Sequence, residues 1–472
     1  MHVRDQLYID GKWVDTTRKG SIDVINPATE EIIGKVPVGS SEDVDKAVAA
    51  ARSAFETWSK SDISQRIDVL NALSNAFKER GEELAQTITA EVGTPIGYSR
   101  VAMVGTPRVV SRSYAKILES FSWEEEVRNS LICKEPVGVC AFITPWNFPL
   151  HQIIGKVAPA IAAGCTMILK PSKEAPLSAF ILADILDEIG LPAGVFNLVS
   201  GHGSEIGNYM SSHPDVDMVS FTGSTGAGVS VSQSAAPTIK RVTLELGGKS
   251  ANVALDDSDP ILVAKKAIGA CHQNSGQTCS ALTRLIIPEE MNEQICEIIA
   301  VKNDSYLVGN PLDETTRCGP MVSSRQQSSV TEYIQSGINE GATLISGGLG
   351  MPDGVDKGFY VKPTIFANVT PNMRIWKEEI FGPVLVITTY KNESEALSLA
   401  NDSIYGLSGG VWSASNERAI EFAKKMRTGQ VSINGGAFNV SAPFGGYKLS
   451  GNGRELGTHG LDEFLEIKSI QM

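Results

Sequence analysis

The stretch CHQNSGQTCS, residues 271–280, contains the side chain best suited to covalent chemistry, the thiol of Cys279. A cysteine in a long chain is often only a small buried hydrophobe. Upstream, VAKKAIGACH repeats apolar residues at helical spacing, and small and polar residues then interrupt the pattern. We therefore expect Cys279 just beyond a helix, in a polar loop whose Gly276 allows close approach. An unperturbed thiol is little ionised at neutral pH, so strong activation requires donors such as Gln277 and loop N–H groups.

Two further polar residues follow predicted apolar strands. Asn147 lies in TPWNFP, where two prolines stiffen the loop. Its amide can donate to a developing oxyanion, or it can simply satisfy a turn. Glu245 ends the apolar run of LELGGK, where burial would raise its pKa toward neutrality and suit it to activate water. Taken alone, this motif fits a capped or ion-paired structural glutamate equally well.

Three more motifs have the chemistry of nucleotide binding. LKPSKEAP offers Lys170 and Lys173 to a ribose hydroxyl or a phosphate. FTGSTGAG ends a strand and opens a helix, so its free N–H groups suit a pyrophosphate, with Ser224 as the nearest hydroxyl. It does not match G-x-G-x-x-G. EEIFGPV adds two acids, either of which can bind a second ribose, and the glycine-rich FGGYKLSGNGREL is expected to close over a ligand.

The elements that must position these residues alternate between strands and helices. From Val137 to about Leu246 the pattern predicts a parallel sheet covered on both faces, which binds ligands at the carboxyl ends of its strands. One helical run is expected from about Ser64 to Ala90. Residues 117–138 fit either a projecting hairpin or an ordinary surface excursion. The C-terminal GLDEFLEIKSIQM predicts a short helix and an exposed strand that can pair with another subunit.

Composition favours small-molecule chemistry. The 472 residues are 42% hydrophobic, enough for two or three domains with large cores. A net charge of −13 without a basic run argues against nucleic acid or an anionic membrane as partner. There is no apolar leader or span, and the seven cysteines form no C-x-x-C pair, so we expect a cytoplasmic protein with reduced thiols. No histidines stand at metal-binding i, i+4 spacing, so no metal is expected.

In order and approximate spacing, PWNFP, KPSK, FTGSTGAG, LELGGK, NSGQTCS, EEIFGPV and PFGGYKLSGNGRE resemble the aldehyde dehydrogenase superfamily over nearly the whole chain. The resemblance implies an α/β protein with a Rossmann-like parallel-sheet cofactor domain, a second α/β catalytic domain and a small β oligomerisation extension. The cofactor domain would comprise residues 1–118 and 139–247, and the catalytic domain residues 248–448. Residues 119–138 and 461–472 would pair subunits in a homodimer or homotetramer, and residues 449–460 would return the chain to the cofactor domain.

The resemblance also assigns roles. Cys279 matches the nucleophile that attacks the aldehyde, and Asn147 with the Cys279 N–H matches the oxyanion hole. Hydride leaves for the nicotinamide, and Glu245 matches the base that activates water against the thioester. Lys156 and Glu455 match residues of a proton relay. Phe148, Phe438 and Phe444 would form an entrance tunnel for apolar or aromatic aldehydes, with no matched cation for a dicarboxylic semialdehyde.

The implied cofactor is NAD or NADP. Its contacts would be Thr144, Pro145, Trp146, Lys170, Ser172, Lys173, Gly203, Gly223, Ser224, Gly228, Leu246, Gly247, Glu379 and Phe381. One departure concerns Lys173, because NAD-preferring members of the family commonly have a glutamate there that holds the adenosine ribose. A lysine can instead pair with a 2′-phosphate, so we hypothesise that NADP is used at least as well as NAD.

Three alternatives remain. A CoA-acylating relative typically lacks the base, so Glu245 counts against it. A cysteine hydrolase that pairs Cys279 with His272 leaves the nucleotide-like motifs unexplained, and His272 belongs to the preceding helix. A catalytically silent structural or binding homologue is disfavoured by the joint presence of Cys279, Glu245 and Asn147.

Overall fold

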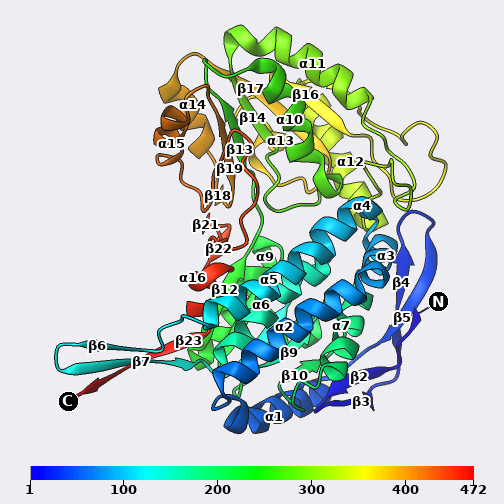
Figure 1. Ribbon diagram of the computed structural model, residues 1–472. Coiled ribbons are helices and arrows are strands. Elements are labelled where there is room, and N and C mark those ends of the chain that lie inside the picture. The colour runs from blue at the N-terminus through cyan, green and yellow to red at the C-terminus, as the bar shows by residue number, and fades with distance from the viewer. Residues whose placement is uncertain (1) are drawn as a thin grey trace.

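The computed structural model describes residues 2–472, which form two lobes and a projecting arm (Figure 1). In Figure 1 the helices within residues 41–235 surround a sheet in the lower lobe, and those within residues 260–423 surround a second sheet in the upper lobe. The central strands of both sheets are parallel. The protein is thus α/β with parallel-sheet domains, as the sequence predicted.

The sheet of the lower lobe is mixed, with a parallel centre. Across the sheet its strands are β22 (Gly451–Asn452), β12 (Arg241–Glu245), β11 (Met218–Thr222), β8 (Val139–Ile143), β9 (Thr166–Lys170), β10 (Phe196–Leu198), β2 (Gln6–Ile9) and β3 (Lys12–Asp15). The strands from β12 to β10 are parallel to one another, and β22, β2 and β3 are antiparallel additions. Every residue of β8, β9 and β11 is buried, because helices cover both faces of the sheet.

The helices of this lobe pack on that sheet and on one another. They are α1 (Ser41–Trp58), α2 (Ile63–Glu79), α3 (Gly81–Val92), α4 (Ile96–Tyr98), α5 (Thr106–Leu118), α6 (Pro149–Ala163), α7 (Leu177–Glu188), α8 (Asn208–Ser212), α9 (Thr225–Ala235) and α16 (Gly457–Asp462), with π-helical segments at Ser99–Gly105 and Gly203–Gly207. The expectation of a single helical run from about Ser64 to Ala90 was wrong. Arg80 leaves the helical region of φ/ψ space and pairs with Glu83 and Glu188, so α2 ends and α3 begins there.

The sheet of the upper lobe is parallel except at one edge. Its strands, in order, are β15 (Thr343–Ser346), β16 (Thr364–Ala367), β17 (Val384–Tyr390), β14 (Arg284–Pro288), β13 (Ala251–Ala254), β19 (Gly409–Trp412) and β20 (Ser432–Ile433), of which β15 is antiparallel to β16. The helices are α10 (Pro260–His272), α11 (Asn292–Asp304), α12 (Ser324–Asn339), α13 (Arg374–Lys377), α14 (Glu393–Asn401) and α15 (Asn416–Ala423), with 3₁₀ turns at Gln273–Gly276 and Glu289–Met291. A further 3₁₀ turn, Ala236–Thr238, lies between α9 and β12 of the lower lobe.

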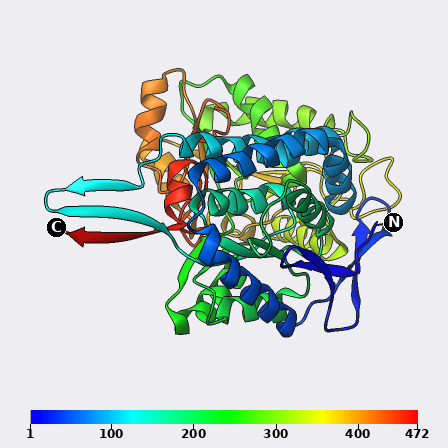
Figure 2. The same cartoon turned by 60° about the horizontal axis from the view of Figure 1, so that its bottom comes forward.

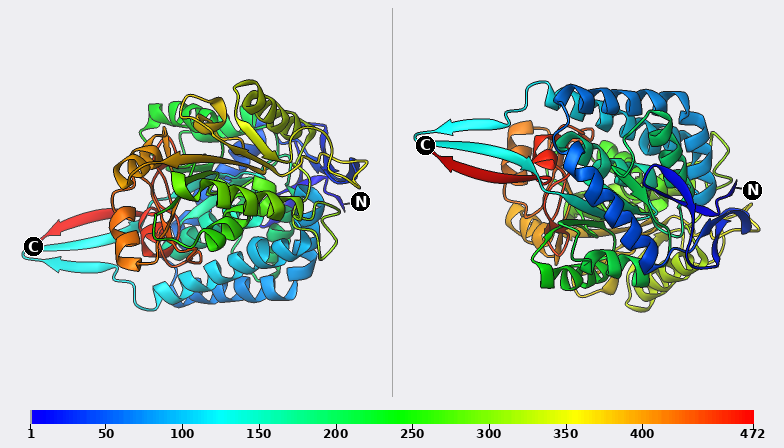
Figure 3. Two further views of the ribbon diagram at one scale, coloured as in Figure 1. Left: turned by 90° about the horizontal axis from the view of Figure 1, so that it is seen from above. Right: turned by 90° about the horizontal axis from the view of Figure 1, so that it is seen from below.

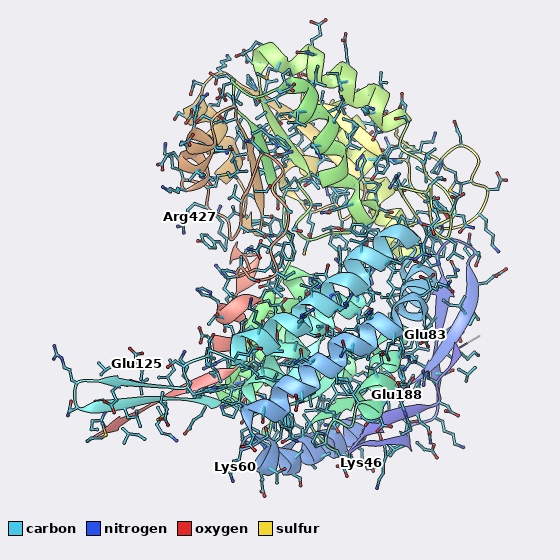
Figure 4. All side chains as sticks on the ribbon, in the orientation of Figure 1. Lys46, Lys60, Glu83, Glu125, Glu188 and Arg427 are labelled. Carbon is cyan, nitrogen blue, oxygen red and sulfur yellow. The ribbon has the colours of Figure 1, made fainter. Side chains whose placement is uncertain are left out.

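Residues 117–138 do form a projecting hairpin. Its strands β6 (Glu124–Val127) and β7 (Ser130–Pro136) are joined by β23 (Leu465–Gln471), which pairs with β7 along its whole length. Figures 2 and 3 show this arm extending beyond the body of the protein from further directions, with the C-terminus at its tip. Glu125, labelled in Figure 4, lies on the arm away from both lobes.

Smaller sheets complete the structure. Near the N-terminus β1 (His2–Val3), β5 (Glu31–Pro37) and β4 (Ser21–Asn26) form one of them, and β18 (Tyr405–Gly406) pairs with β21 (Tyr447–Lys448) in another. Across residues 2–472 we find no helix that combines the length and the apolar character of a membrane span.

The register of the first sheet aligns the predicted site residues. Lys170 on β9 is level with Ile143 on β8, which immediately precedes TPWNFP. Phe221 on β11 is also level with Ile143, and the next pair along is Thr222 with Glu245 of β12. Because parallel strands end at the same edge, this row forms a continuous carboxyl edge, where such sheets bind ligands.

Candidate active site

The loop that carries Cys279 follows α10 and the turn Gln273–Gly276. Asn274, Ser275 and Gly276 all have positive φ, so the chain reverses sharply after the helix. A Cβ on Gly276 would collide with the backbone of Gly382, in the EEIFGPV motif. Glycine is therefore required here, because it lets the backbone of the Cys279 loop approach that motif.

Hydrogen bonds hold Asn147 against this loop. The amide of Asn147, 4% exposed, donates to the carbonyl of Gln277 at 3.0 Å. The side chain of Asn274 donates to the Asn147 carbonyl at 2.9 Å and accepts from Thr94 Oγ1 at 2.7 Å. The Gln277 side chain is itself fixed, since its oxygen accepts from the Val322 N–H at 2.9 Å. An amide nitrogen has two hydrogens, so Asn147 keeps one for a ligand.

The thiol of Cys279 is not activated in this structure. Burial raises its pKa, and the carboxylates of Glu379, Glu245 and Glu455 raise it further, against a backbone N–H contribution from Ser280. We expected Gln277 to donate to the thiol, but within the described residues its side-chain nitrogen donates to the carbonyls of Asn274 and Pro320, and its oxygen accepts from the Val322 N–H. Burial and the neighbouring carboxyl groups therefore both disfavour the Cys279 thiolate.

The neighbouring residues of α10 do not compete for this role. Cys271 is fully buried, and burial raises the pKa of its thiol to about 12. Burial lowers the pKa of His272 to about 4, and its Nε2 lies 2.9 Å from Asn303 Oδ1. His272 is thus held in a structural network, which argues against a Cys279–His272 hydrolase.

Glu245 lies at the centre of a charged cluster. It is 5% exposed, and within residues 2–472 neither of its buried carboxylate oxygens has a hydrogen-bond partner. Burial raises its pKa well above the ordinary value, Glu455 raises it further, and Lys156 opposes the shift. Lys156, on α6, is 1% exposed and donates to Thr222 Oγ1 at 2.7 Å and to Glu455 Oε1. The structure therefore brings together the three residues predicted for base and relay, with a buried lysine between the second carboxylate and Thr222.

An aromatic cavity of about 200 Å³ opens at Cys279. Phe148, Phe438 and Phe444 all line it, together with Glu455, so the predicted tunnel residues do meet at the thiol. Asn147 and Glu245 are not among its lining residues. Sequence reasoning missed several that are: Tyr98, Ala102, Thr106, His151, Gln152, Gln273, Thr278, Ser280 and Leu456. The helical periodicity of α6, which continues directly from TPWNFP, was the available signal for His151 and Gln152.

The cavity continues outward. A groove of about 680 Å³ between α10 and the segment 430–443 shares Gln273, Ser280 and Phe438 with it. Phe438 is 51% exposed and thus stands at the mouth.

At the carboxyl edge of the first sheet, the predicted nucleotide-binding residues divide into buried and open ones. Thr144 is buried with its hydroxyl unpaired in the described part of the chain, and burial lowers the pKa of Lys170 to about 8. Lys170 Nζ donates to the Pro171 carbonyl at 2.8 Å. Ser172 Oγ accepts from the backbone N–H of Glu174, and Lys173 is an exposed side chain 3.5 Å from the Glu174 carboxylate. The Lys173 side chain is therefore exposed to solvent, whereas Thr144 and Lys170 are buried.

The glycine motif forms a helix start, as predicted. Ser224 caps α9, and its hydroxyl accepts from the Ala227 N–H at 3.4 Å. A Cβ on Gly223 would stand 2.6 Å from the Phe221 ring, and one on Gly228 would stand 2.7 Å from Leu246. Gly203 begins the π-helical segment and is exposed, with open space around its Cα. The strand and helix thus pack closely while the first turn of α9 stays accessible.

Glu379 contacts the segment that joins β12 to β13. Its Oε1 accepts from the Gly248 N–H at 2.9 Å, and burial raises its pKa to about 7. A Cβ on Gly247 would collide with the Glu379 carboxylate, so this contact requires glycine. Phe381, two residues on, packs edge to face on Trp146 at 5.4 Å between ring centroids, and Pro145 precedes Trp146 as a half-buried residue.

Metal ligands are not gathered anywhere in residues 2–472, since no group of three or more His, Cys, Asp or Glu is placed to hold an ion. All seven cysteines are unpaired thiols. The site offers a thiol, a buried carboxylate, amide and backbone donors, and an aromatic cavity.

Comparison with known proteins agrees with this arrangement. The sequence pattern of the aldehyde dehydrogenase family matches residues 13–470. A 3-succinoylsemialdehyde-pyridine dehydrogenase from Pseudomonas sp is 49% identical over 468 residues, 98% of this chain and 98% of that protein.

Solved structures are equally similar. A mutant of aldehyde dehydrogenase C from Pseudomonas syringae, crystallised with NAD+ and octanal, has a TM-score of 0.98 and 46% identity, covering 99% of this chain and 96% of that one. Betaine aldehyde dehydrogenase from Staphylococcus aureus in complex with NAD+ has a TM-score of 0.96 and 38% identity, covering 99% and 95%. The chain therefore belongs to the aldehyde dehydrogenase family, and it is an enzyme that oxidises aldehydes.

Proposed function

We propose that this enzyme oxidises an aldehyde to the carboxylic acid with NAD(P)+, by way of a thiohemiacetal and a thioester on Cys279. The observation that carries the proposal is that the Cys279 thiol borders an aromatic cavity while the Asn147 amide is hydrogen-bonded to the Cys279 loop. The unpaired Glu245 carboxylate lies at the end of β12, close enough to act electrostatically on the thiol. The relatives act on or bind aldehydes of several kinds, as their names state.

In the first half-reaction the Cys279 thiol loses its proton to solvent water and Sγ attacks the aldehyde carbonyl carbon to give a thiohemiacetal. The carbonyl oxygen becomes an oxyanion, which accepts hydrogen bonds from the free N–H of Asn147 and the Cys279 backbone N–H. As the C–O double bond forms again, the C–H bond breaks and the thioester results; bound NAD(P)+ would accept the hydride, and its cationic ring would favour the thiolate. Asn274 and Gln277 keep Asn147 in place, so that its amide is oriented before the charge develops.

In the second half-reaction Glu245 removes a proton from water, and the oxygen of that water attacks the thioester. Both Glu245 oxygens lack hydrogen bonds from the described residues and the pKa of the group is raised, so its affinity for a proton suits a general base. The ion pair of Lys156 with Glu455 lies beside it and can carry the proton onward, since Glu455 also borders the cavity. The products are the acid and the free thiol.

The residues at the sheet edge fit a dinucleotide. The open first turn of α9 suits the pyrophosphate, and Thr144 has an unpaired buried hydroxyl. Glu379, held by the Gly248 N–H, keeps lone pairs for the hydroxyls of the nicotinamide ribose. Solved relatives contain NAD+, so we propose NAD+ as a cofactor, with NADP+ accepted through the exposed Lys173.

We further propose that a second copy of the chain pairs with the arm in a homodimer or homotetramer. Strands β6 and β23 leave free edges in the described chain, and Ile467, Ile470 and Met472 are 70%, 44% and 69% exposed. Light scattering of the full chain and of Ile467→Asp checks this, since a monomeric wild type contradicts it. Seven unpaired thiols support a reducing, cytoplasmic location.

The test of the reaction is NAD(P)H formation, followed by absorbance, with a broad aldehyde panel and with and without CoA. Cys279→Ser is expected to lower kcat by at least about a thousandfold, because an alcohol is a far weaker nucleophile than a thiol. Cys271→Ser, on the preceding helix and inert by its burial, is the matched control. Turnover that requires CoA would favour the acylating alternative, and no turnover with any aldehyde would favour a silent homologue.

A further inference from the structure

The cavity at Cys279 is aromatic on its walls and polar along one side. Tyr98, Phe148, Phe438 and Phe444 supply the rings. Its volume of about 200 Å³ is below the roughly 300–1,000 Å³ of pockets for drug-sized ligands. Apart from His151, the described residues that line it include one acidic or basic side chain, Glu455, whose carboxylate is paired with Lys156. An aromatic ring without charge suits the space next to Cys279, and the groove beyond Phe438 leaves room for a longer substituent.

His151 is a polar side chain of this cavity whose buried Nδ1 has no hydrogen-bond partner in residues 2–472. It lies in the first turn of α6, and its ring packs edge to face between Phe148 and Phe438, at centroid distances of 6.3 and 6.4 Å. The accessible part of the ring borders the cavity. By contrast, the Tyr98 hydroxyl already donates to Gln273 at 3.3 Å.

The next residue, Gln152, also lines the cavity, and its buried Oε1 is likewise unpaired in the described chain. The two residues differ in exposure. The His151 imidazole packs edge to face on Phe148 and Phe438 and is partly exposed, whereas Gln152 is only 6% exposed. The start of α6 therefore offers one pre-positioned polar group, with a second beside it.

The His151 ring is neutral at physiological pH. Burial lowers its pKa to about 4, the nearby Lys156 lowers it further, and Glu455 opposes the shift. A neutral imidazole has one donor and one acceptor nitrogen. A half-turn about the second torsion exchanges the two ring nitrogens while the imidazole keeps its place between Phe148 and Phe438, so either nitrogen can face a ligand. Unpaired polar groups in buried places call for a partner, and the cavity is where one can enter.

We propose that His151 is a specificity-determining residue, which selects aromatic aldehydes that carry a hydrogen-bonding ring atom or substituent over apolar aldehydes of the same size. The inference rests on the proposed function, since it names the substrate class of that same site. Phe148 and Phe438 hold the imidazole from both sides, so its position is set before the substrate arrives. An apolar ring in the cavity leaves the imidazole without a hydrogen-bond partner, whereas a ring with a polar atom or substituent supplies one.

The experiment compares benzaldehyde with pyridine-3-carbaldehyde, which differ by one ring nitrogen in place of a C–H. The ratio of their kcat/KM values is measured in wild type, His151→Phe and His151→Gln. Because pyridine also activates the carbonyl, the change in ratio between variants is the informative quantity, as in a double-mutant cycle. We expect His151→Phe to lower the pyridine-to-benzene ratio about tenfold, and His151→Gln, which keeps a donor and an acceptor, to retain most of it.

The neighbouring amide supplies the matched control. Gln152→Met removes the other unpaired polar group of the same helical turn while keeping a long side chain. We expect it to leave most of the pyridine-to-benzene ratio in place. A large loss of the ratio in Gln152→Met, with none in His151→Phe, would assign the selection to Gln152 and overturn the role of His151.

Binding to an unreactive enzyme separates this inference from the proposed function. In the Cys279→Ala background, calorimetry gives Kd for both aldehydes with and without His151→Phe as the second change, and His151→Leu replaces His151→Phe if that variant does not fold. A loss of the pyridine preference of about tenfold supports the inference even if no variant turns over. An equal ratio in wild type and in the apolar variants, by either measurement, overturns it.

Discussion

Glu245 and Glu379 are carboxyl groups that both act electrostatically on Cys279, and burial raises the pKa of both. They differ in what holds them. Glu379 accepts a hydrogen bond from the Gly248 N–H, which fixes its orientation and opposes the shift. Glu245 has no hydrogen bond at either oxygen within the described chain.

The difference teaches how one residue type supports two roles. A carboxylate held by a backbone N–H keeps its geometry and can position a ligand hydroxyl. An unpaired buried carboxylate is unstable as an anion and has a high affinity for a proton, which is the property a general base needs. This difference supports our proposal that Glu245, at the end of β12, acts as the base and that Glu379, in the EEIFGPV loop, binds a ligand hydroxyl.

The largest expected effect comes from Glu245→Gln, which keeps the shape and removes the base. We expect steady-state kcat to fall by about 10²–10⁴-fold, while a single-turnover burst of NAD(P)H remains, because the first half-reaction does not use this carboxylate. Stopped-flow absorbance measures both. If Glu245→Gln abolished the burst as well as the turnover, Glu245 would be needed in the first half-reaction, and the role of a base for thioester hydrolysis alone would be wrong.

Glu379→Gln is expected to act on binding. Replacing an anionic acceptor by an amide weakens hydrogen bonds to ribose hydroxyls, so KM for the cofactor should rise roughly 10- to 100-fold with a smaller change in kcat. The exposed neighbour Glu378, which pairs with Arg374, provides the control Glu378→Gln. Equal effects of the two variants would contradict the role given to Glu379.

Lys173→Glu probes the other end of the cofactor. An acid at this exposed position can accept from ribose hydroxyls and repels a 2′-phosphate, so the NAD-to-NADP ratio of kcat/KM should rise about tenfold. Steady-state kinetics with both cofactors measure it. A strong wild-type preference for NAD would refute the hypothesis that NADP is used at least as well.

The smallest expected effect is a shift in pH dependence. Glu455 raises the pKa of Glu245. A base works when deprotonated, so thioester hydrolysis is lost as the pH falls through that raised pKa. Removing the Glu455 charge in Glu455→Gln should therefore move this acidic limb to lower pH, changing rates by less than about tenfold at any one pH. Pre-steady-state hydrolysis rates against pH test it, and an upward shift would contradict the electrostatic coupling.

The sequence by itself determined the α/β class, the helix before Cys279 and the strand ends that carry Asn147, Lys170 and Glu245. These follow from local periodicity and from prolines and glycines, which act over a few residues. It also predicted the hairpin at 120–138 as one of two possibilities. It misjudged the region around Arg80, where the backbone leaves the helical region just before Gly81, so that α2 ends and α3 begins.

Only the tertiary structure decided the burial and the hydrogen-bond partners of the side chains at the site. Glu245 is unpaired while Glu379 is held, and Gln277 is turned away from Cys279, because partners from remote segments occupy or leave each position. His151 enters the cavity because α6 directs it between Phe148 and Phe438, and Phe438 arrives from a distant part of the chain. Burial and hydrogen bonding depend on such long-range contacts, which no local pattern encodes.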